Sequence, residues 1–290
     1  MKRKGIILAG GSGTRLYPLT NITSKQLLPV YDKPLIFYPL TTLMLANIRE
    51  ILIITTEEDR SKFENFIGTG EQWGLDISYA IQKKPEGIAQ SLIIAKDFII
   101  NDAIALILGD NIFFGNDLSS KLITESEKFL PASLFLYHVN DPENYGVVKF
   151  DKNLNPIDVI EKPREYTSNF AVTGLYFYNN DAISIAEKLK PSARGELEIT
   201  DLNREYLKKN MLNYNILERG FAWLDTGTHD SLLSAGEFVS TIQKRQGLMI
   251  ACPEEIALRK GWINENSFKS SISKYRKSSY GEYLEKIIQD

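Results

Sequence analysis

Short apolar runs alternate with helical stretches through most of the chain, and this alternation constrains the fold more than any other feature. Apolar, β-branched runs predict strands at 6–9, 51–55, 77–81, 104–108, 134–139, 146–150, 172–178 and 214–217. Apolar residues at helical spacing predict helices at 35–46, 58–66, 88–98 and 118–129. Strands and helices in alternation are typical of a mostly parallel sheet with helices on both faces. We therefore expect an α/β fold.

The pattern changes twice along the chain. From about 137 to 180 the predicted strands follow one another closely, which favours an antiparallel or mixed addition to the parallel sheet. After about residue 228, helices are predicted at 230–246, 253–259 and 278–289. We expect an α/β core over 1–227, including the addition at 137–180, and a helical C-terminal subdomain over 228–290.

Charge and composition exclude several classes of function. The 290 residues include 34 Lys and Arg and 37 Asp and Glu, a formal net charge of −3, so the chain lacks the bulk positive charge of many nucleic-acid binders. One cysteine and two histidines are too few for a disulfide framework or a zinc site built from them. The sequence has neither a long apolar span nor a signal-peptide pattern. We expect a cytoplasmic protein that binds neither nucleic acid nor membrane.

A glycine-rich segment, Gly10-Gly11-Ser12-Gly13-Thr14-Arg15, follows the first predicted strand. Glycines at the carboxyl end of a strand let backbone N–H groups approach phosphate oxygens, and Arg15 would add a bidentate cation. Lys25, one loop further, could reach the same phosphates. The segment does not end as a P-loop does, and it matches the dinucleotide fingerprint only in part, because the third glycine falls on Leu16. These residues alone leave two other interpretations open: the glycines could form only a structural turn, and Lys25 could be a solvated surface charge.

Two carboxylates each end an apolar run. Asp110 follows the run 104–108, whose carboxyl end should open on the crevice where α/β sheets bind ligands. Asp225 ends the run that begins at 221. Two carboxylates and substrate phosphates would make a reasonable Mg²⁺ site. Spacing does not show that the two side chains meet, and a turn or helix-cap role for Asp110 stays open.

The ordered motifs resemble those of the sugar-1-phosphate nucleotidyltransferases. The matching segments span about residues 5–260 and are 10–20, 25–30, 85–90, 108–111, 144–147, 161–163, 195–201 and 223–227. The segment 25–30 and the segment 252–257 are most similar to the members that transfer a thymidylyl group to glucose 1-phosphate. The resemblance implies a Rossmann-like, mostly parallel mixed sheet of the nucleotide-diphospho-sugar transferase type, with C-terminal helices.

The resemblance also implies the reaction. A phosphate oxygen of glucose 1-phosphate attacks the α-phosphorus of dTTP, pyrophosphate leaves, and dTDP-glucose forms as the first product on the way to dTDP-L-rhamnose. Mg²⁺ is the implied cofactor. Such a transfer depends on positioning and charge neutralisation more than on a covalent nucleophile. The family further implies a homotetramer, with feedback inhibition by dTDP-rhamnose at a second site on a subunit interface.

Roles for single residues follow from the same resemblance. The expected catalytic residues are Arg15, Lys25, Asp110, Lys162 and Asp225, with Mg²⁺ held by Asp110 and Asp225. Nucleotide contacts are expected from Leu8, Gly10, Gly11, Ser12, Gly13, Thr14, Arg15, Lys25, Gln26, Gln82, Gly87 and Asp110, with Gln82 and Gly87 at the thymine. Contacts to the sugar phosphate are expected from Tyr145, Gly146, Glu161, Lys162, Val172 and Arg194.

Three alternatives stay open. A uridylyltransferase could use the same fold, and the pocket around 82–87 would decide between thymine and uracil nucleotides. A nucleotide-sugar sensor could have lost catalysis, although the full set of expected catalytic residues argues against it. A dinucleotide-dependent oxidoreductase is supported only by the partial glycine match.

Overall fold

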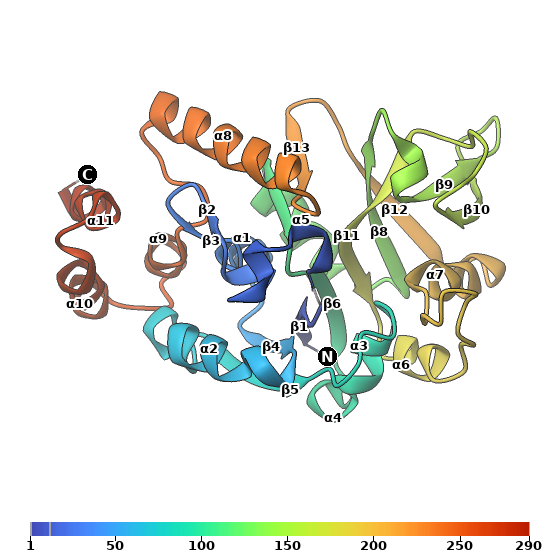
Figure 1. The fold of residues 1–290 in the computed structure, drawn as a ribbon, viewed down its shortest axis with the longest axis horizontal. Coiled ribbons are helices and arrows are strands. Elements are labelled where there is room, and N and C mark those ends of the chain that lie inside the picture. The colour runs from blue at the N-terminus through green and yellow to red at the C-terminus, as the bar shows by residue number, and fades with distance from the viewer. Residues whose placement is uncertain (1, 12, 290) are drawn as a thin grey trace.

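Four parallel strands form one half of the main sheet in a computed structural model that describes residues 2–11 and 13–289 (Figure 1). Their order is β6 (Ala103–Leu108), β1 (Arg3–Ala9), β4 (Glu50–Thr55) and β5 (Asp76–Ile81). Successive strands of this group are joined through helices, because a parallel connection must cross back over the sheet. The predicted mostly parallel α/β sheet is therefore confirmed.

The other half of the sheet is mixed. β11 (Phe170–Tyr178) runs antiparallel to β6 and to β8 (Ala132–His138), and β12 (Leu212–Leu217) runs parallel to β8. The hairpin of β9 (Gly146–Phe150) and β10 (Pro156–Glu161) joins β11 near its N-terminal end. This arrangement confirms the antiparallel addition expected between about 137 and 180.

The central strands are buried on both faces. Ile6 and Ile7 of β1 are fully buried and point to opposite faces, because side chains alternate along a strand. Ile7 belongs to the core cluster that includes α1 (Phe37–Leu45), α2 (Glu57–Ile67) and α5 (Leu118–Glu127). Ile6 belongs to the cluster on the other face, with α3 (Gln90–Ile94), α4 (Lys96–Ile99), α6 (Asp181–Ala186) and α7 (Ile199–Lys208). The two clusters explain why long apolar runs predict these strands well.

Two small ribbons lie outside the main sheet. β7 (Asn111–Gly115) pairs antiparallel with β13 (Phe221–Asp225), and β2 (Pro29–Val30) pairs with β3 (Lys33–Pro34). β7 begins directly beyond the turn that ends β6. The first ribbon thus brings the end of β13 back to the carboxyl end of β6.

The helices after residue 228 extend from the core to one end of the molecule (Figure 1). α8 (His229–Gln246) contacts β2 and β13, and α9 (Pro253–Arg259) contacts α1. α10 (Glu265–Tyr275) and α11 (Ser279–Gln289) pack with α9 around Phe268 and Leu284. The subdomain boundary at 228 stays a prediction, since α8 packs on the strands that precede it.

Several elements differ from those predicted. The helix predicted at 88–98 is two helices, α3 and α4, which meet at Ala95. α6, α7 and α10 were not predicted, although Phe268, Ile272 and Tyr275 of α10 have helical spacing and pack in one cluster. Short 3-10 helices occupy loops: η1 (Thr14–Leu16), η2 (Leu19–Asn21), η3 (Lys25–Leu27), η4 (Glu71–Trp73) and η5 (Pro142–Asn144). No helix in the described ranges has the length and apolar character needed to cross a bilayer.

Candidate active site

The glycine-rich loop turns sharply at the carboxyl end of β1. Gly13 has a φ of 61°, and a β-carbon there would lie 2.9 Å from Cγ2 of Thr20, so both conformation and space favour glycine. The Thr20 hydroxyl donates to the Gly13 carbonyl at 2.8 Å and holds the turn. η1 follows at once and presents Arg15. Ser12, a predicted nucleotide contact, lies outside the described residues.

Lys25 and Asp110 form an ion pair at the carboxyl edge of the sheet. Lys25 is the first residue of η3 and its side chain is buried. Its Nζ lies 2.6 Å from Oδ2 of Asp110. Asn111 donates to the other carboxylate oxygen, Oδ1, at 2.9 Å. Burial raises the pKa of Asp110, but the charge and hydrogen bond of Lys25, with the bond from Asn111, outweigh burial and lower it. Asp110 is therefore held as an anion, and Lys25 is not a solvated surface charge.

The β7–β13 ribbon brings Asp225 to the same place. Asp225 pairs in register with Asn111, and the hydroxyl of Thr226 donates to the backbone carbonyl of Asp110 at 2.9 Å. Burial raises the pKa of Asp225, and the negative charge of Asp110 raises it further, while Lys25 and Arg15 oppose the shift. The charges of the two carboxylates that were predicted to bind a metal thus affect one another.

Two cavities meet at this centre. The inner cavity, about 200 Å³, contains predicted residues from both halves of the sheet: Arg15, Asp110, Tyr145, Gly146, Glu161, Lys162, Val172 and Asp225. The loop cavity, about 280 Å³, contains the glycine-rich loop and its neighbours: Gly11, Gly13, Thr14, Arg15, Lys25, Gln26 and Asp110. Arg15 and Asp110 line both. The inner cavity therefore gathers the predicted sugar-phosphate contacts except Arg194, and the loop cavity gathers predicted phosphate contacts of the nucleotide. The two cavities join at Arg15 and Asp110.

Aromatic rings form one wall of the inner cavity. The rings of Tyr145 and Trp223 lie 5.1 Å apart. Oδ1 of Asn111 accepts hydrogen bonds from Nε1 of Trp223 at 2.6 Å and from the backbone N–H of Gly174 at 3.0 Å. Burial, and then the charge of Asp225, raise the pKa of Tyr145 to about 12, so its hydroxyl stays protonated. Asn111 therefore connects this wall to Asp110.

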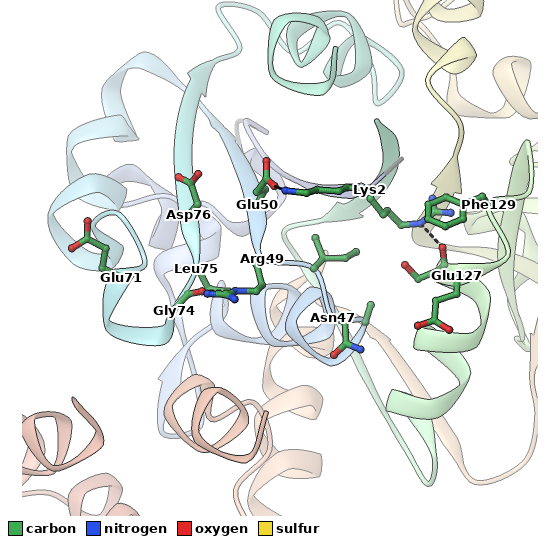
Figure 2. A pocket seen from close by; sticks show the side chains of 14 residues that line it. Lys2, Asn47, Arg49, Glu50, Glu71, Gly74, Leu75, Asp76, Glu127 and Phe129 are labelled. Atoms are coloured by element: carbon green, nitrogen blue, oxygen red, sulfur yellow. Dashed lines mark hydrogen bonds and ion pairs between the residues drawn. The ribbon is translucent and has the colours of Figure 1, made fainter. Parts of the chain in front are cut away.

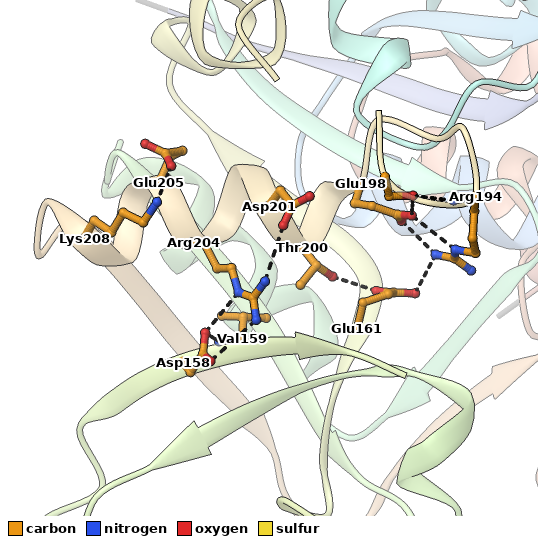
Figure 3. Close-up of polar contacts among 11 residues, drawn as sticks. Asp158, Val159, Glu161, Arg194, Glu198, Thr200, Asp201, Arg204, Glu205 and Lys208 are labelled. Atoms are coloured by element: carbon orange, nitrogen blue, oxygen red, sulfur yellow. Dashed lines mark hydrogen bonds and ion pairs between the residues drawn. The ribbon is translucent and has the colours of Figure 1, made fainter. Parts of the chain in front are cut away.

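Glu161 and Arg194 belong to a network of charged groups at the N-terminal end of α7 (Figure 3). Arg194 pairs with Glu198 at 2.8 Å, with Glu161 at 3.3 Å and with Glu196 at 3.8 Å. The hydroxyl of Thr200 donates to Oε2 of Glu161 at 2.6 Å. Glu161 faces the inner cavity from the end of β10, whereas Arg194 lines neither cavity and reaches the site through Glu161.

Lys162 has an unusual backbone conformation. Its φ is 44°, in the left-handed region that non-glycine residues seldom adopt, and its N–H donates to the Tyr145 carbonyl at 3.0 Å. This hydrogen bond ties the end of β10 to the segment before β9. The predicted contact of Lys162 with the sugar phosphate stays a prediction.

The remaining predicted nucleotide contacts surround the loop without lining either cavity. Leu8 accepts a hydrogen bond from Gly109 at 2.9 Å, which fixes the turn before Asp110. Gln82 is buried at the end of β5, where a β-carbon on Gly10 would lie 3.0 Å from its Cβ. Gly87 has a φ of 103° and lies against the backbone of Leu197.

The inner cavity also contains residues that had no predicted role, and three of them have polar side chains that matter here: Asn111, Thr200 and Trp223. All three fall within the motifs of the family resemblance, but only the structure shows what each side chain contacts. Among the described residues, no group of three or more His, Cys, Asp or Glu is placed to hold a metal. A metal held by Asp110 and Asp225 would thus need further oxygen ligands from its substrates.

A wider cavity, about 660 Å³, lies at the opposite edge of the sheet, where β1, β4 and β5 begin (Figure 2). Its charged side chains are mixed in sign, and Lys2 already pairs with Glu50 at 2.9 Å. None of the described site residues predicted from the sequence lines it. This cavity is larger than the inner cavity and the loop cavity, but the predicted site residues are gathered at the carboxyl edge.

Comparison with known proteins decides the family. The family model described as nucleotidyl transferase matches residues 4–242. The chain belongs to the nucleotidyl transferase family. As a family member it is a nucleotidyltransferase, and the dinucleotide-dependent oxidoreductase is no longer a viable alternative.

Relatives within the nucleotidyl transferase family match almost the whole chain. Glucose-1-phosphate thymidylyltransferase of Neisseria meningitidis is 53% identical over 286 residues, 99% of each chain. The enzyme of the same name from Mycolicibacterium smegmatis is 52% identical over 285 residues, 98% of this chain and 99% of the relative. These relatives confirm the predicted branch of the family.

Solved structures of nucleotidyl transferase relatives confirm the fold. A Bacillus anthracis protein described as glucose-1-phosphate thymidylyltransferase, in complex with a sucrose, has a TM-score of 0.75 at 43% identity, covering 81% of this chain and 94% of that one. UDP-glucose pyrophosphorylase complexed with UDP-glucose has a TM-score of 0.74 at 26% identity, covering 84% and 100%. The predicted nucleotide-diphospho-sugar transferase type of sheet is therefore correct.

Proposed function

We propose that this nucleotidyltransferase transfers dTMP from dTTP to α-D-glucose 1-phosphate, giving dTDP-glucose and pyrophosphate. The convergence of Arg15, Lys25, Asp110 and Asp225 where the inner and loop cavities join supports the proposal most strongly. Each cavity would hold one substrate. The reacting phosphates would then meet at the junction, between two cationic and two anionic side chains.

The chain's own residues would position and neutralise the phosphates. Backbone N–H groups of the glycine-rich loop and the guanidinium of Arg15 would hold the triphosphate of dTTP and stabilise the departing pyrophosphate. Lys25 would offset charge at the α-phosphate. Lys162 would hold the phosphate of glucose 1-phosphate in line, with Tyr145, Gly146, Glu161 and Val172 around the sugar. No covalent enzyme intermediate is needed.

Magnesium fits the two carboxylates. Asp110 and Asp225 offer the oxygen ligands that Mg²⁺ prefers, and their mutual repulsion would be relieved by a cation. One or two carboxylates with substrate phosphates are a common Mg²⁺ environment. When bound, Mg²⁺ would supply charge neutralisation at the phosphates that react. We therefore propose Mg²⁺ as the cofactor.

Pyrophosphate release tests the proposed reaction. The purified chain is incubated with glucose 1-phosphate and Mg²⁺, and with dTTP, UTP, dCTP or ATP in turn. We expect the highest kcat/KM with dTTP. A marked preference for UTP would identify a uridylyltransferase, and binding of dTTP without pyrophosphate release would identify a sensor.

We extend the proposal to assembly, regulation and location. A homotetramer in the cytoplasm, inhibited by dTDP-rhamnose at a subunit interface, is what the family resemblance implies. A candidate position for the second site is the cavity of about 450 Å³ between α1, α5 and α9, which shares no residue with the inner or loop cavity. Sedimentation velocity gives the assembly. Inhibition that dTTP does not relieve would support a second site.

A further inference from the structure

A chain of side-chain amides leads from the surface to the buried Gln82. Nε2 of Gln82 donates to Oε1 of Gln90 at 2.7 Å, and Nε2 of Gln90 donates to Oε2 of Glu86 at 2.7 Å. The backbone N–H of Glu86 is shared between two acceptors, the Lys84 carbonyl at 3.0 Å and Oε1 of Gln90 at 3.2 Å. Gln90 is the first residue of α3, and Gln82 follows β5 directly. Three polar side chains are thus connected in one relay.

The direction of each hydrogen bond in this relay is fixed by two groups at Glu86, a carboxylate that can only accept and a backbone N–H that can only donate. The carboxylate of Glu86 can only accept a hydrogen bond, so the NH₂ group of Gln90 must face it. A backbone N–H can only donate, so the oxygen of Gln90 must face the N–H of Glu86. That oxygen then requires a donor from Gln82. The orientation of the Gln82 amide follows from these partners, and does not depend on telling oxygen from nitrogen in the amide itself.

The backbone around Glu86 is held firmly enough to serve as this anchor. The N–H of Leu197 donates to the Glu86 carbonyl at 2.7 Å, and the N–H of Ala89 donates to the Leu197 carbonyl at 3.2 Å. Gly87, between them, has no room for a side chain, because a β-carbon would lie 2.7 Å from the backbone nitrogen of Leu197. Segments 86–89 and 197 therefore fix the N–H that orients Gln90.

The Gln82 amide consequently presents a fixed arrangement of hydrogen-bond donor and acceptor toward the glycine-rich loop. Its Oε1 lies against Gly10, and within the described ranges no hydrogen-bond donor occupies this oxygen. One hydrogen of its Nε2 is used by Gln90, which leaves the other hydrogen and the oxygen for a ligand. An acceptor beside a donor is complementary to N3–H beside O4 of thymine or uracil. Cytosine presents the reverse pattern, an unprotonated N3 beside an amino group.

We propose that Gln90, held by Glu86, is a positioning residue that fixes the Gln82 amide so that the site accepts keto pyrimidine nucleotides and rejects cytosine nucleotides. The inference rests on the proposed function, in which the Gln82 side chain contacts the thymine base of the nucleotide. Without the relay, the amide of Gln82 can turn over and offer its NH₂ group to N3 of cytosine. Selectivity then depends on a residue that does not touch the base.

The test compares two variants through the ratio of kcat/KM for dTTP to kcat/KM for dCTP. Gln90→Leu removes all three hydrogen bonds of the Gln90 side chain at nearly constant size, and we expect the ratio to fall about tenfold or more. The double variant Glu86→Gln with Gln90→Glu exchanges donor and acceptor without changing net charge. The new carboxylate at 90 still accepts from Gln82, and we expect the ratio to return to within about twofold of the wild-type value.

Binding of dTMP and dCMP by each variant, measured without metal, gives a second readout, and thermal melts show whether each variant is folded. We expect the two readouts to agree. Equal losses for dTTP and dCTP in Gln90→Leu, with the ratio unchanged, would overturn the proposal and leave Gln90 a structural residue. Failure of the wild-type protein to use dTTP would instead refute the proposed function, so the two failures are distinguishable.

Discussion

The guanidinium of Arg15 and the carboxylate of Asp225 lie on the same side of Gly227. A β-carbon on Gly227 would be 3.1 Å from Oδ1 of Asp225 and 3.3 Å from both terminal nitrogens of Arg15. The φ of Gly227 is not in the left-handed region, so the backbone would accept another residue. Space for the two functional groups, and not conformation, is what favours glycine at this position.

Gly227→Ala should therefore affect the reaction more than the fold. The added methyl group displaces the ends of Arg15 and Asp225 by a few tenths of an ångström, and catalysis is sensitive to such displacement. We expect kcat to fall about tenfold with little change in the melting temperature. Gly236→Ala on α8, whose β-carbon would have only an ordinary contact at 3.6 Å, is the matched control and should have wild-type kcat. Equal kcat values for the two variants would contradict the prediction.

Replacing either carboxylate should abolish most turnover. Asp110→Asn and Asp225→Asn each remove one of the two proposed Mg²⁺ ligands while keeping the size of the side chain. We expect kcat to fall at least about a hundredfold, as when a main electrostatic contribution is lost. The measurement is pyrophosphate release over a range of Mg²⁺ concentrations. Near-normal rates in either variant would refute the metal assignment for that residue.

Lys25 and Asp110 should be energetically coupled in the folded protein. Lys25→Met leaves the Asp110 carboxylate without its cation, and Asp110→Asn leaves the Lys25 ammonium without its anion. We expect each single variant to lower the free energy of unfolding, and the double variant to lose about 1 to 3 kcal/mol less than the sum of the two. Urea unfolding of the three variants completes the cycle. Strict additivity would show that the ion pair contributes nothing to stability.

Gly87→Ala should disturb the segment that anchors Gln90. Its left-handed φ of 103° strains any L side chain, and the new β-carbon would also overlap the backbone of Leu197. We expect a clear loss of stability and a higher KM for dTTP. Gly195→Ala separates the two effects, since Gly195 has a φ of 78° but open space around its β-carbon position. Similar melting temperatures for the two variants would show that strain, and not the overlap, dominates.

Glu125 lies away from the active site, and its buried carboxylate should make the stability of the protein depend on pH. Burial raises the pKa of Glu125, but the bonds from Lys128, Ser133 and Asn215 outweigh it, so the pKa lies below the ordinary value of 4.5. Because the folded-state pKa is lowered, the contribution to stability is present above about pH 4.5 and is lost as the pH falls through the folded-state value. Glu125→Gln should therefore cost about 1 to 3 kcal/mol at pH 7.

The difference between wild type and Glu125→Gln should shrink as the pH is lowered from 5 to 3. Chemical denaturation at a series of pH values measures it. Glu127→Gln, at an exposed position two residues along the same chain segment, is the control and should leave the pH dependence unchanged. A difference that does not change with pH would assign the effect of Glu125 to packing.

Local sequence pattern predicts the central sheet because burial on both faces leaves continuous apolar runs, as around Ile6 and Ile7. The same pattern does not reveal the β7–β13 ribbon. Its strands come from distant parts of the chain, and their pairing depends on tertiary contacts that no local period encodes. α10 was missed for a different reason: its apolar residues Phe268, Ile272 and Tyr275 have helical spacing, but they are few and stand among serines and lysines.

The candidate site also contains some residues that the sequence predicts and others that it does not. Arg15, Lys25 and Asp110 follow strands or glycines and can be predicted from the types of residue at those positions. Asn111 and Trp223 could not be assigned roles, because the role of Asn111 comes from hydrogen bonds to Asp110, Trp223 and Gly174. Only one of these partners is its neighbour in the sequence. Residues that position others depend on the folded arrangement and have little signature of their own.

The β7–β13 ribbon has a consequence for how the protein becomes active as it folds. Asp110 and Asp225 lie far apart in the chain, and they meet only when Asn111 and Asp225 take up their register. Closing so long a loop is entropically costly and slow compared with the formation of helices and neighbouring strands. A refolding chain should regain its helical circular dichroism before it regains the two-carboxylate centre. Competence for the reaction thus depends on one long-range pairing, and it should return later than the local structure does.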